Sequence, residues 1–138
     1  MDNNDSVKYN DQTDLRPEGE RILDAPLVHM DLNEFSKTIK SEKTWKEKDR
    51  NAITVYKTDG MRMVLVALHK GAVLERHTAN GNISVQVLDG EINFSTDDQT
   101  VNLKEGQAIA LHKNIHHEVT AIKESIFLLT LNTVKSLS

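Results

Sequence analysis

The chain has 138 residues, of which 28% are charged and 38% hydrophobic, with a formal net charge of −4 and no cysteine. This length suits one domain better than two, and the lack of cysteine excludes disulfides, thiolate catalysis and sulfur-ligated zinc. No apolar run approaches the roughly 20 residues that span a bilayer, and the N-terminus lacks the basic and apolar regions of a signal peptide. We therefore expect a soluble cytoplasmic protein without a membrane partner.

The N-terminal stretch differs in charge from the rest of the chain. Residues 1–24 hold seven of the 21 acidic residues and three of the 17 basic ones, which leaves 14 of each sign elsewhere. The stretch also lacks periodic apolar positions and contains Pro17 and Gly19. We predict that it is a mobile acidic tail, or a strap on the surface of a partner. The balanced remainder has no basic stripe for phosphates, so no nucleic-acid partner is expected.

Residues 25–50 are predicted to be an N-terminal helical segment. Apolar residues recur at helical spacing in this segment, namely Leu32, Phe35 and Ile39. Asp31 precedes them at the position of an N-cap. We expect a short amphipathic helix whose apolar face lies on the domain, with Trp45 as a nearby anchor.

Residues 51–138 are predicted to form a β domain. Nine short runs rich in Val, Ile and Leu are separated by turn residues, and they lie at 52–57, 61–69, 73–77, 83–88, 91–94, 100–103, 108–112, 116–122 and 126–131. The dipeptide Asp89-Gly90 between two of these runs is typical of a tight hairpin. Nine strands without helical interruptions indicate an all-β fold, a closed or double-sheet antiparallel barrel.

The same region resembles a known family. Gly71, His77 and Gly90 match the first cupin motif, G(X)5HXH(X)3–4E(X)6G, and Gly106 and His117 match the second, G(X)5PXG(X)2H(X)3N. The resemblance covers residues 51 to 132 and implies a small single-domain cupin of the conserved-barrel, RmlC-like type. It implies a double-stranded β-helix, or jelly-roll barrel, and a homodimer. Apolar runs such as "FLLTL" and "MVLVAL" show too little alternation of apolar and polar residues for one face of the strand to be exposed to water. This also favours burial against a partner.

The chain departs from the metal-binding pattern of that family. Cupins that hold a metal present two histidines and a glutamate from the first motif and one histidine from the second. Here Ala79 stands at the second histidine position, and Ile83 stands at the glutamate position counted back from Gly90. The alternative spacing puts Ser84 there instead.

The residues expected to bind a ligand in the barrel are His77, His117, Gln86 and His112. Imidazole nitrogen suits Zn, Ni and Fe(II), so His77 and His117 are also candidate ligands of a divalent metal. A stable site needs three or four protein ligands, and the candidates for a third are His69, Gln86 and His112. His69 is otherwise a structural or surface histidine.

Strand geometry leaves two registers open for the strand after His77. Side chains alternate between the two faces of a strand, so Ile83 lines the barrel in one register, while Ser84 and Gln86 line it in the other. By the same alternation, His116 is expected to point away from the barrel when His117 points into it.

Three functions are consistent with this sequence. The first is binding of a small molecule in the barrel pocket, which we favour because the anionic metal ligand is missing. The second is a metal-dependent enzyme, an oxygenase or isomerase acting on a small organic acid or phenol. The third is a role in assembly with a vestigial pocket.

Overall fold

The computed structural model describes residues 8–10 and 21–133. Its two helices are α1 (Leu32–Ser41) and α2 (Lys43–Glu47). The strands are β1 (Lys8–Asn10), β2 (Arg21–Asp24), β3 (Arg50–Thr58), β4 (Met61–Leu68), β5 (Val73–His77), β6 (Asn82–Asp89), β7 (Glu91–Thr96), β8 (Thr100–Lys104), β9 (Ala108–Leu111), β10 (His117–Ala121) and β11 (Ser125–Asn132). No helix in the described ranges is long and apolar enough to cross a membrane.

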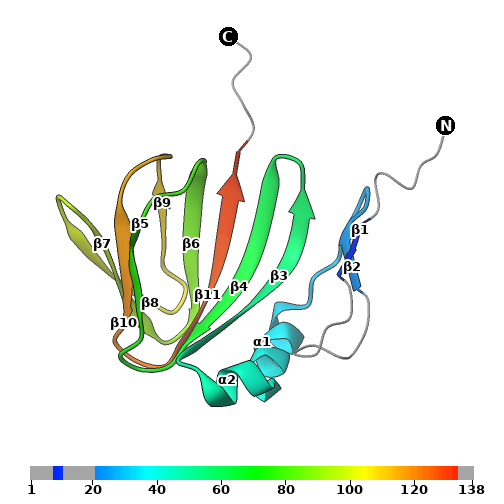
Figure 1. The fold of residues 1–138 in the computed structure, drawn as a ribbon, viewed down its shortest axis with the longest axis horizontal. Coiled ribbons are helices and arrows are strands. Elements are labelled where there is room, and N and C mark those ends of the chain that lie inside the picture. The colour runs from blue at the N-terminus through cyan, green and yellow to red at the C-terminus, as the bar shows by residue number, and fades with distance from the viewer. Residues whose placement is uncertain (1–7, 11–20, 134–138) are drawn as a thin grey trace, which may run out of the picture.

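Two antiparallel sheets face each other and enclose the main core (Figure 1). One sheet has five strands in the order β3-β4-β11-β6-β9, and the other has four in the order β5-β10-β7-β8. Apart from the neighbouring pairs β3-β4 and β7-β8, consecutive strands from β3 onward lie in opposite sheets, as in a jelly roll. The predicted all-β antiparallel architecture is confirmed.

Strand alternation gives the five-stranded sheet two apolar faces. On β4, Val66 and Leu68 belong to the core between the sheets, whereas Leu65 and Ala67 belong to a second core on the outer face. β11 divides in the same way, with Phe127 facing inward. This explains why the central strands are nearly continuous apolar runs.

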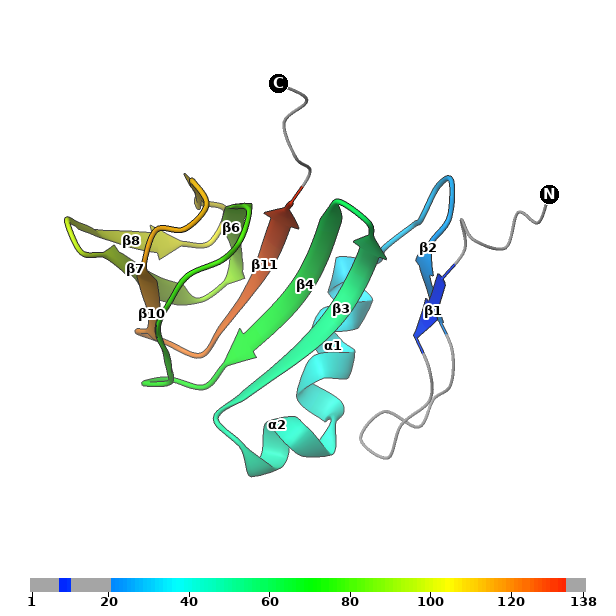
Figure 2. The same cartoon turned by 45° about the horizontal axis from the view of Figure 1, so that its top comes forward.

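The two helices cover the outer face of β3 and β4 (Figure 2). Helix α1 begins where predicted, because the Asp31 side chain accepts a hydrogen bond from the Glu34 amide at 3.1 Å. On the side of the helices that faces the sheet, Ile39 of α1 is fully buried and Trp45 of α2 is 7% exposed. This outer face, for which the sequence predicts a partner subunit, is thus covered by helices of the same chain, so the apolar runs do not argue for a dimer.

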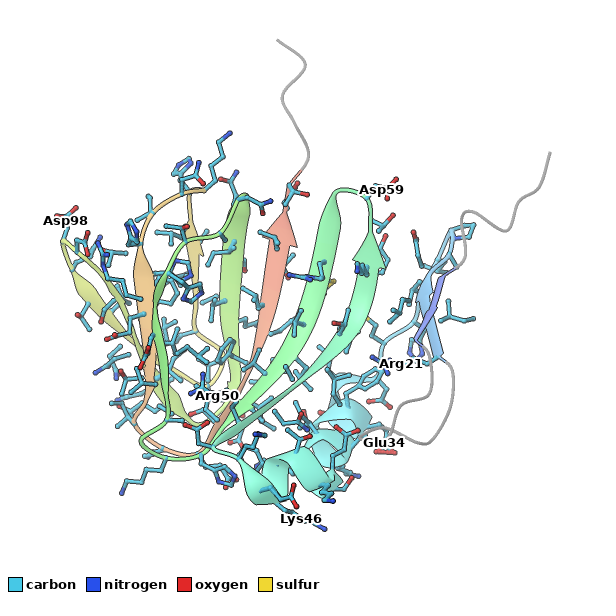
Figure 3. The ribbon with its side chains drawn as sticks, in the orientation of Figure 1. Arg21, Glu34, Lys46, Arg50, Asp59 and Asp98 are labelled. Carbon is cyan, nitrogen blue, oxygen red and sulfur yellow. The ribbon has the colours of Figure 1, made fainter. Side chains whose placement is uncertain are left out.

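Polar contacts fasten the start of β3 to its surroundings. The Asn51 side chain is buried and donates to the Ile39 carbonyl and to the Glu42 carboxylate, both at 2.9 Å. Arg50 donates to the Val73 carbonyl at 2.8 Å and so joins β3 to β5 of the other sheet (Figure 3). Asn51 thus ties β3 to the helical segment, and Arg50 connects the two sheets at the end of the barrel near the helices.

The expected boundary of the N-terminal tail at residue 24 needs correction. Strand β2 pairs with β1, and its Leu23 and Asp24 are each 8% exposed. Arg21 points from β2 toward the body of the domain, where it donates to the Thr54 carbonyl and lies over the ring of Phe35 (Figure 3). The folded part therefore begins by residue 21. The remainder of the predicted tail, apart from Lys8–Asn10, lies outside the described residues.

The predicted hairpin at Asp89-Gly90 is also wrong. β6 pairs with β9 and β11, whereas β7 pairs with β8 and β10, so the turn joins the two sheets. Gly90 has φ +93°, and a Cβ there would lie 2.4 Å from the Glu124 carbonyl oxygen. The glycine was correctly associated with a sharp turn, but local sequence does not show which partner each flanking strand takes.

Candidate functional site

Two histidines from distant parts of the chain face each other at one end of the barrel. His77 ends β5, His117 begins β10, and the two are paired across these neighbouring strands. Their ring centroids lie 4.3 Å apart with an angle of 58° between the ring planes. The predicted proximity of the two rings is confirmed, and their binding of a common ligand stays a prediction.

Backbone carbonyls fix the orientation of both rings. The Nδ1 atom of His77 lies 2.6 Å from the Glu75 carbonyl oxygen, and that of His117 lies 2.9 Å from the Ile115 carbonyl oxygen. A carbonyl oxygen only accepts, so each Nδ1 carries a proton. In the neutral form of each ring, Nε2 is then left with a lone pair for a metal or a hydrogen-bond donor.

His117 is held in an environment that disfavours its charged form. Its side chain is 5% exposed, and its ring stacks on Phe94 with centroids 5.4 Å apart. Burial is the main cause that lowers the pKa of His117, the nearby His77 and His116 lower it further, and the Ile115 carbonyl opposes them. His117 therefore presents a neutral imidazole near neutral pH.

The histidine pair opens on a cavity of about 450 Å³. Its polar lining residues are Arg62, His77, Thr78, Asn80, Asn114 and His117. Its apolar lining residues are Ala79, Ile83, Leu129 and Leu131. None of these is acidic, so within the described residues the walls of the cavity carry no carboxylate.

The five-stranded sheet forms the wall that includes an arginine. Leu131 of β11 pairs with Arg62 of β4 on one side and with Ile83 of β6 on the other, so the three lie in one row across the sheet. Sequence reasoning missed Arg62. The signal was available, because Arg62 shares the inward parity of Val64 and Val66 on the same strand.

The register of β6 settles which side chains line the cavity. Ile83 is 5% exposed and faces inward, as the spacing from Gly90 predicts. Ser84 and Gln86 lie on the opposite face of the strand, and Gln86 is exposed. The structure therefore does not bring Gln86, proposed as a ligand residue, to the histidine pair.

The other two candidate ligands also lie elsewhere. The ring of His69 stacks on Trp45 at 3.4 Å between centroids, and its Nε2 lies 2.9 Å from the Trp45 carbonyl oxygen. His69 thus fastens α2 to the end of β4. His112 is exposed after β9 and does not line the cavity. Sequence motifs alone could not exclude either residue, because their exclusion depends on how the strands pair.

The residues present do not make up the full metal set of the resembled family. His77 and His117 supply two imidazoles, whereas stable sites use three or four protein ligands. The described residues contain no group of three or more histidines, aspartates or glutamates that could hold an ion. Ala79 and Ile83 line the same cavity at the positions of the two missing ligands.

No protein-family model matches the chain, and no curated protein matches it either. Solved structures do match. A conserved protein of unknown function from Streptococcus pyogenes is 25% identical with a TM-score of 0.60, covering 65% of this chain and 80% of its own. A cupin superfamily protein from Desulfitobacterium hafniense is 16% identical with a TM-score of 0.61, covering 64% and 81%.

A cupin 2 conserved barrel domain protein from Leptotrichia buccalis has the higher identity of 31%. Its TM-score is 0.59, and the match covers 62% of this chain and 42% of that one. These matches support a small cupin-type domain with an all-β fold.

Proposed function

We propose that this small cupin domain binds a small molecule in the mouth of its barrel, with His77 and His117 as paired anchors. The observation that carries the proposal is that two imidazoles, each fixed through Nδ1, turn toward one cavity. The cavity volume of about 450 Å³ lies within the range of small-molecule pockets. Apolar walls with a few convergent polar groups are the usual composition of such pockets.

The chemistry of the cavity favours binding over metal-dependent catalysis. A divalent cation in a poorly solvated site is normally balanced by an anionic ligand, and none of the lining side chains is acidic. Ile83 instead places an aliphatic group where the resembled family uses a carboxylate.

A metal-dependent cupin enzyme is the second candidate, and one observation favours it. Histidines that bind metals usually donate their other ring N–H to a carbonyl or carboxylate, and both His77 and His117 do so. A metal there would act as a Lewis acid toward an oxygen of the substrate. The two histidines would hold it, with exogenous ligands completing the coordination.

Metal analysis of protein purified without a histidine tag separates these candidates. We expect far less than one Zn, Ni or Fe per chain, and stoichiometric metal would favour the enzyme. Screening small fragments by NMR tests the binding proposal directly. Fragments that bind should perturb the imidazole signals of His77 and His117 in the wild type. His117→Gln should weaken the binding of these fragments, whereas the exposed control His112→Gln should not.

We also propose, from the family resemblance alone, that the chain forms a homodimer. Light scattering of the full chain tests this, and a mass near the 15.6 kDa of one chain would contradict it.

A further inference from the structure

We infer that the ligand is a small organic acid whose carboxylate is bound by Arg62, an inference that rests on the proposed binding function. Arg62 is not part of the motifs that the sequence shares with cupins. It enters the cavity from β4 of the five-stranded sheet, while the histidine pair comes from β5 and β10 of the facing sheet.

Arg62 is the arginine without a partner in the part of the chain that the structure describes. Arg50 and Arg76 make paired contacts with Asp49 and Asp97 at 2.8 Å, and Arg21 donates to the Thr54 carbonyl. No hydrogen bond or ion pair within the described residues engages the Arg62 guanidinium. Its five N–H donors form a planar fork that matches a carboxylate.

The charge of the cavity favours an anion. Among its described lining residues, Arg62 has the only permanently charged side chain, and burial keeps His117 neutral. Arg62 is exposed at the edge of the cavity, where its positive charge can attract an anion from solvent.

The other residues that line the cavity limit the chemical structure of the acid. Leu131 and Ile83 lie in the same row of the sheet as Arg62, and Leu129 lies two residues before Leu131 on β11. The part of the ligand next to its carboxylate should therefore be apolar. On the facing sheet, the Nδ1 atoms of His77 and His117 are engaged by backbone carbonyls, which leaves each Nε2 of the neutral rings able to accept a hydrogen bond from a ligand. The ligand class is therefore a small acid with an apolar middle and a hydroxyl or amino group at its far end.

Matched pairs of acids and amides test this inference. The probes are 4-hydroxybenzoate and 3-hydroxybutyrate, their primary amides, and a fragment set of other acids and neutral compounds, titrated into the labelled full chain and followed by NMR. We expect at least one acid to bind about tenfold or more tightly than its amide, since tenfold corresponds to roughly 1.4 kcal/mol, the scale of one charge-assisted hydrogen bond.

Variants then assign the effect to Arg62. Arg62→Gln should reduce acid binding to the level of the amide, Arg62→Lys should retain part of it, and Arg76→Gln, an arginine outside the cavity, should leave it unchanged. His77→Gln should weaken the acid and the amide alike. Spectra of the free variants establish that each one is folded.

Four outcomes would overturn the inference. Neutral fragments that bind at the cavity as tightly as acids, or an Arg62→Gln variant that still prefers acids, would exclude the arginine contact but leave the binding function standing. Displacement of the acids by equimolar inorganic phosphate would show that the apolar walls contribute nothing. A fragment set in which neither acids nor neutral compounds reach the cavity would overturn the proposed function as well.

Discussion

His117 is nearly buried and touches the rings of both Phe94 and His77. Its motif position predicted a functional residue, and its partner His77 was predicted in the same way. The stacking on Phe94 was not predictable, because it depends on the pairing of β10 with β7. The sequence therefore predicted the imidazole but not its surroundings, which determine its protonation.

The stability of the fold should depend on pH through His117. Its pKa is lowered, mainly by burial, below the ordinary value of 6.5. Between the folded and unfolded pKa values the unfolded chain binds more protons, so the free energy of unfolding decreases as the pH is lowered through that window. The contribution of His117 is complete above about 6.5 and is lost as pH falls through the folded pKa.

Urea unfolding at a series of pH values measures this effect. Wild type should lose more stability between pH 7.5 and acidic pH than His117→Gln, in which the group is absent. His112→Gln is the control and should follow wild type. A pH dependence that is the same in wild type and His117→Gln would contradict the prediction.

Gly90 gives a second prediction at this scale. A Cβ there would lie 2.4 Å from both the Glu124 carbonyl oxygen and the Ser125 hydroxyl oxygen. Gly90→Ala should therefore combine left-handed strain with overpacking and cost roughly 2 to 5 kcal/mol of unfolding free energy. Gly106 has a similar φ of +84° with nothing within 4 Å of the added carbon, so Gly106→Ala should cost about 1 to 2 kcal/mol. Equal losses in chemical denaturation would show that the backbone at Gly90 moves aside.

At the scale of elements, strand β2 shows how a short segment docks without joining a large sheet. Leu23 is 8% exposed, whereas its neighbour Ile22 is 46% exposed on the opposite face. The strand was missed because four residues in an acidic, proline-containing stretch give no usable periodicity. Its burial is visible only once β3 and α1 are in place.

Leu23→Ala should lower the free energy of unfolding by about 2 kcal/mol, the low end for loss of a buried leucine, because the strand lies at the periphery. Ile22→Ala is the matched control and should change it by no more than about 0.5 kcal/mol. Thermal and urea unfolding measure both. If the two variants behave alike, β2 does not dock in solution.

The register of β6 makes the missing metal site a testable design. Ala79→His together with Ile83→Glu puts an imidazole and a carboxylate on two positions that already line the cavity with His77 and His117. Zn or Ni should bind at least about tenfold more tightly than in wild type, because the carboxylate offsets the charge of the metal. The metal-free variant should be less stable than wild type and recover when metal is added.

Calorimetric titration measures that gain, and the strand provides its own control. Ala79→His with Ser84→Glu places the carboxylate on the outer face of β6 and should not reach this affinity. If both double variants bind equally well, Ile83 does not face the histidines.

On the scale of the whole molecule, the apolar runs of β4 and β11 predicted the strands but not what covers each face. Their apolar runs suggested a partner subunit, because the sequence does not tell which segment lies against an outer face. The structure places α1 and α2 there. Tight turns likewise predicted where strands end, while the assignment of strands to two sheets came only from long-range pairing, which also gathers Arg62, His77 and His117.

The stacking of His69 on Trp45 gives the molecule an optical property. Trp45 is the single tryptophan of the chain and is nearly buried where α2 meets the end of β4. The emission of an indole depends on the groups in contact with its ring, so detachment of the helix from His69 alters the emission. The intrinsic fluorescence of this protein therefore follows one contact, between helix and sheet, and can time its formation during refolding without any added label.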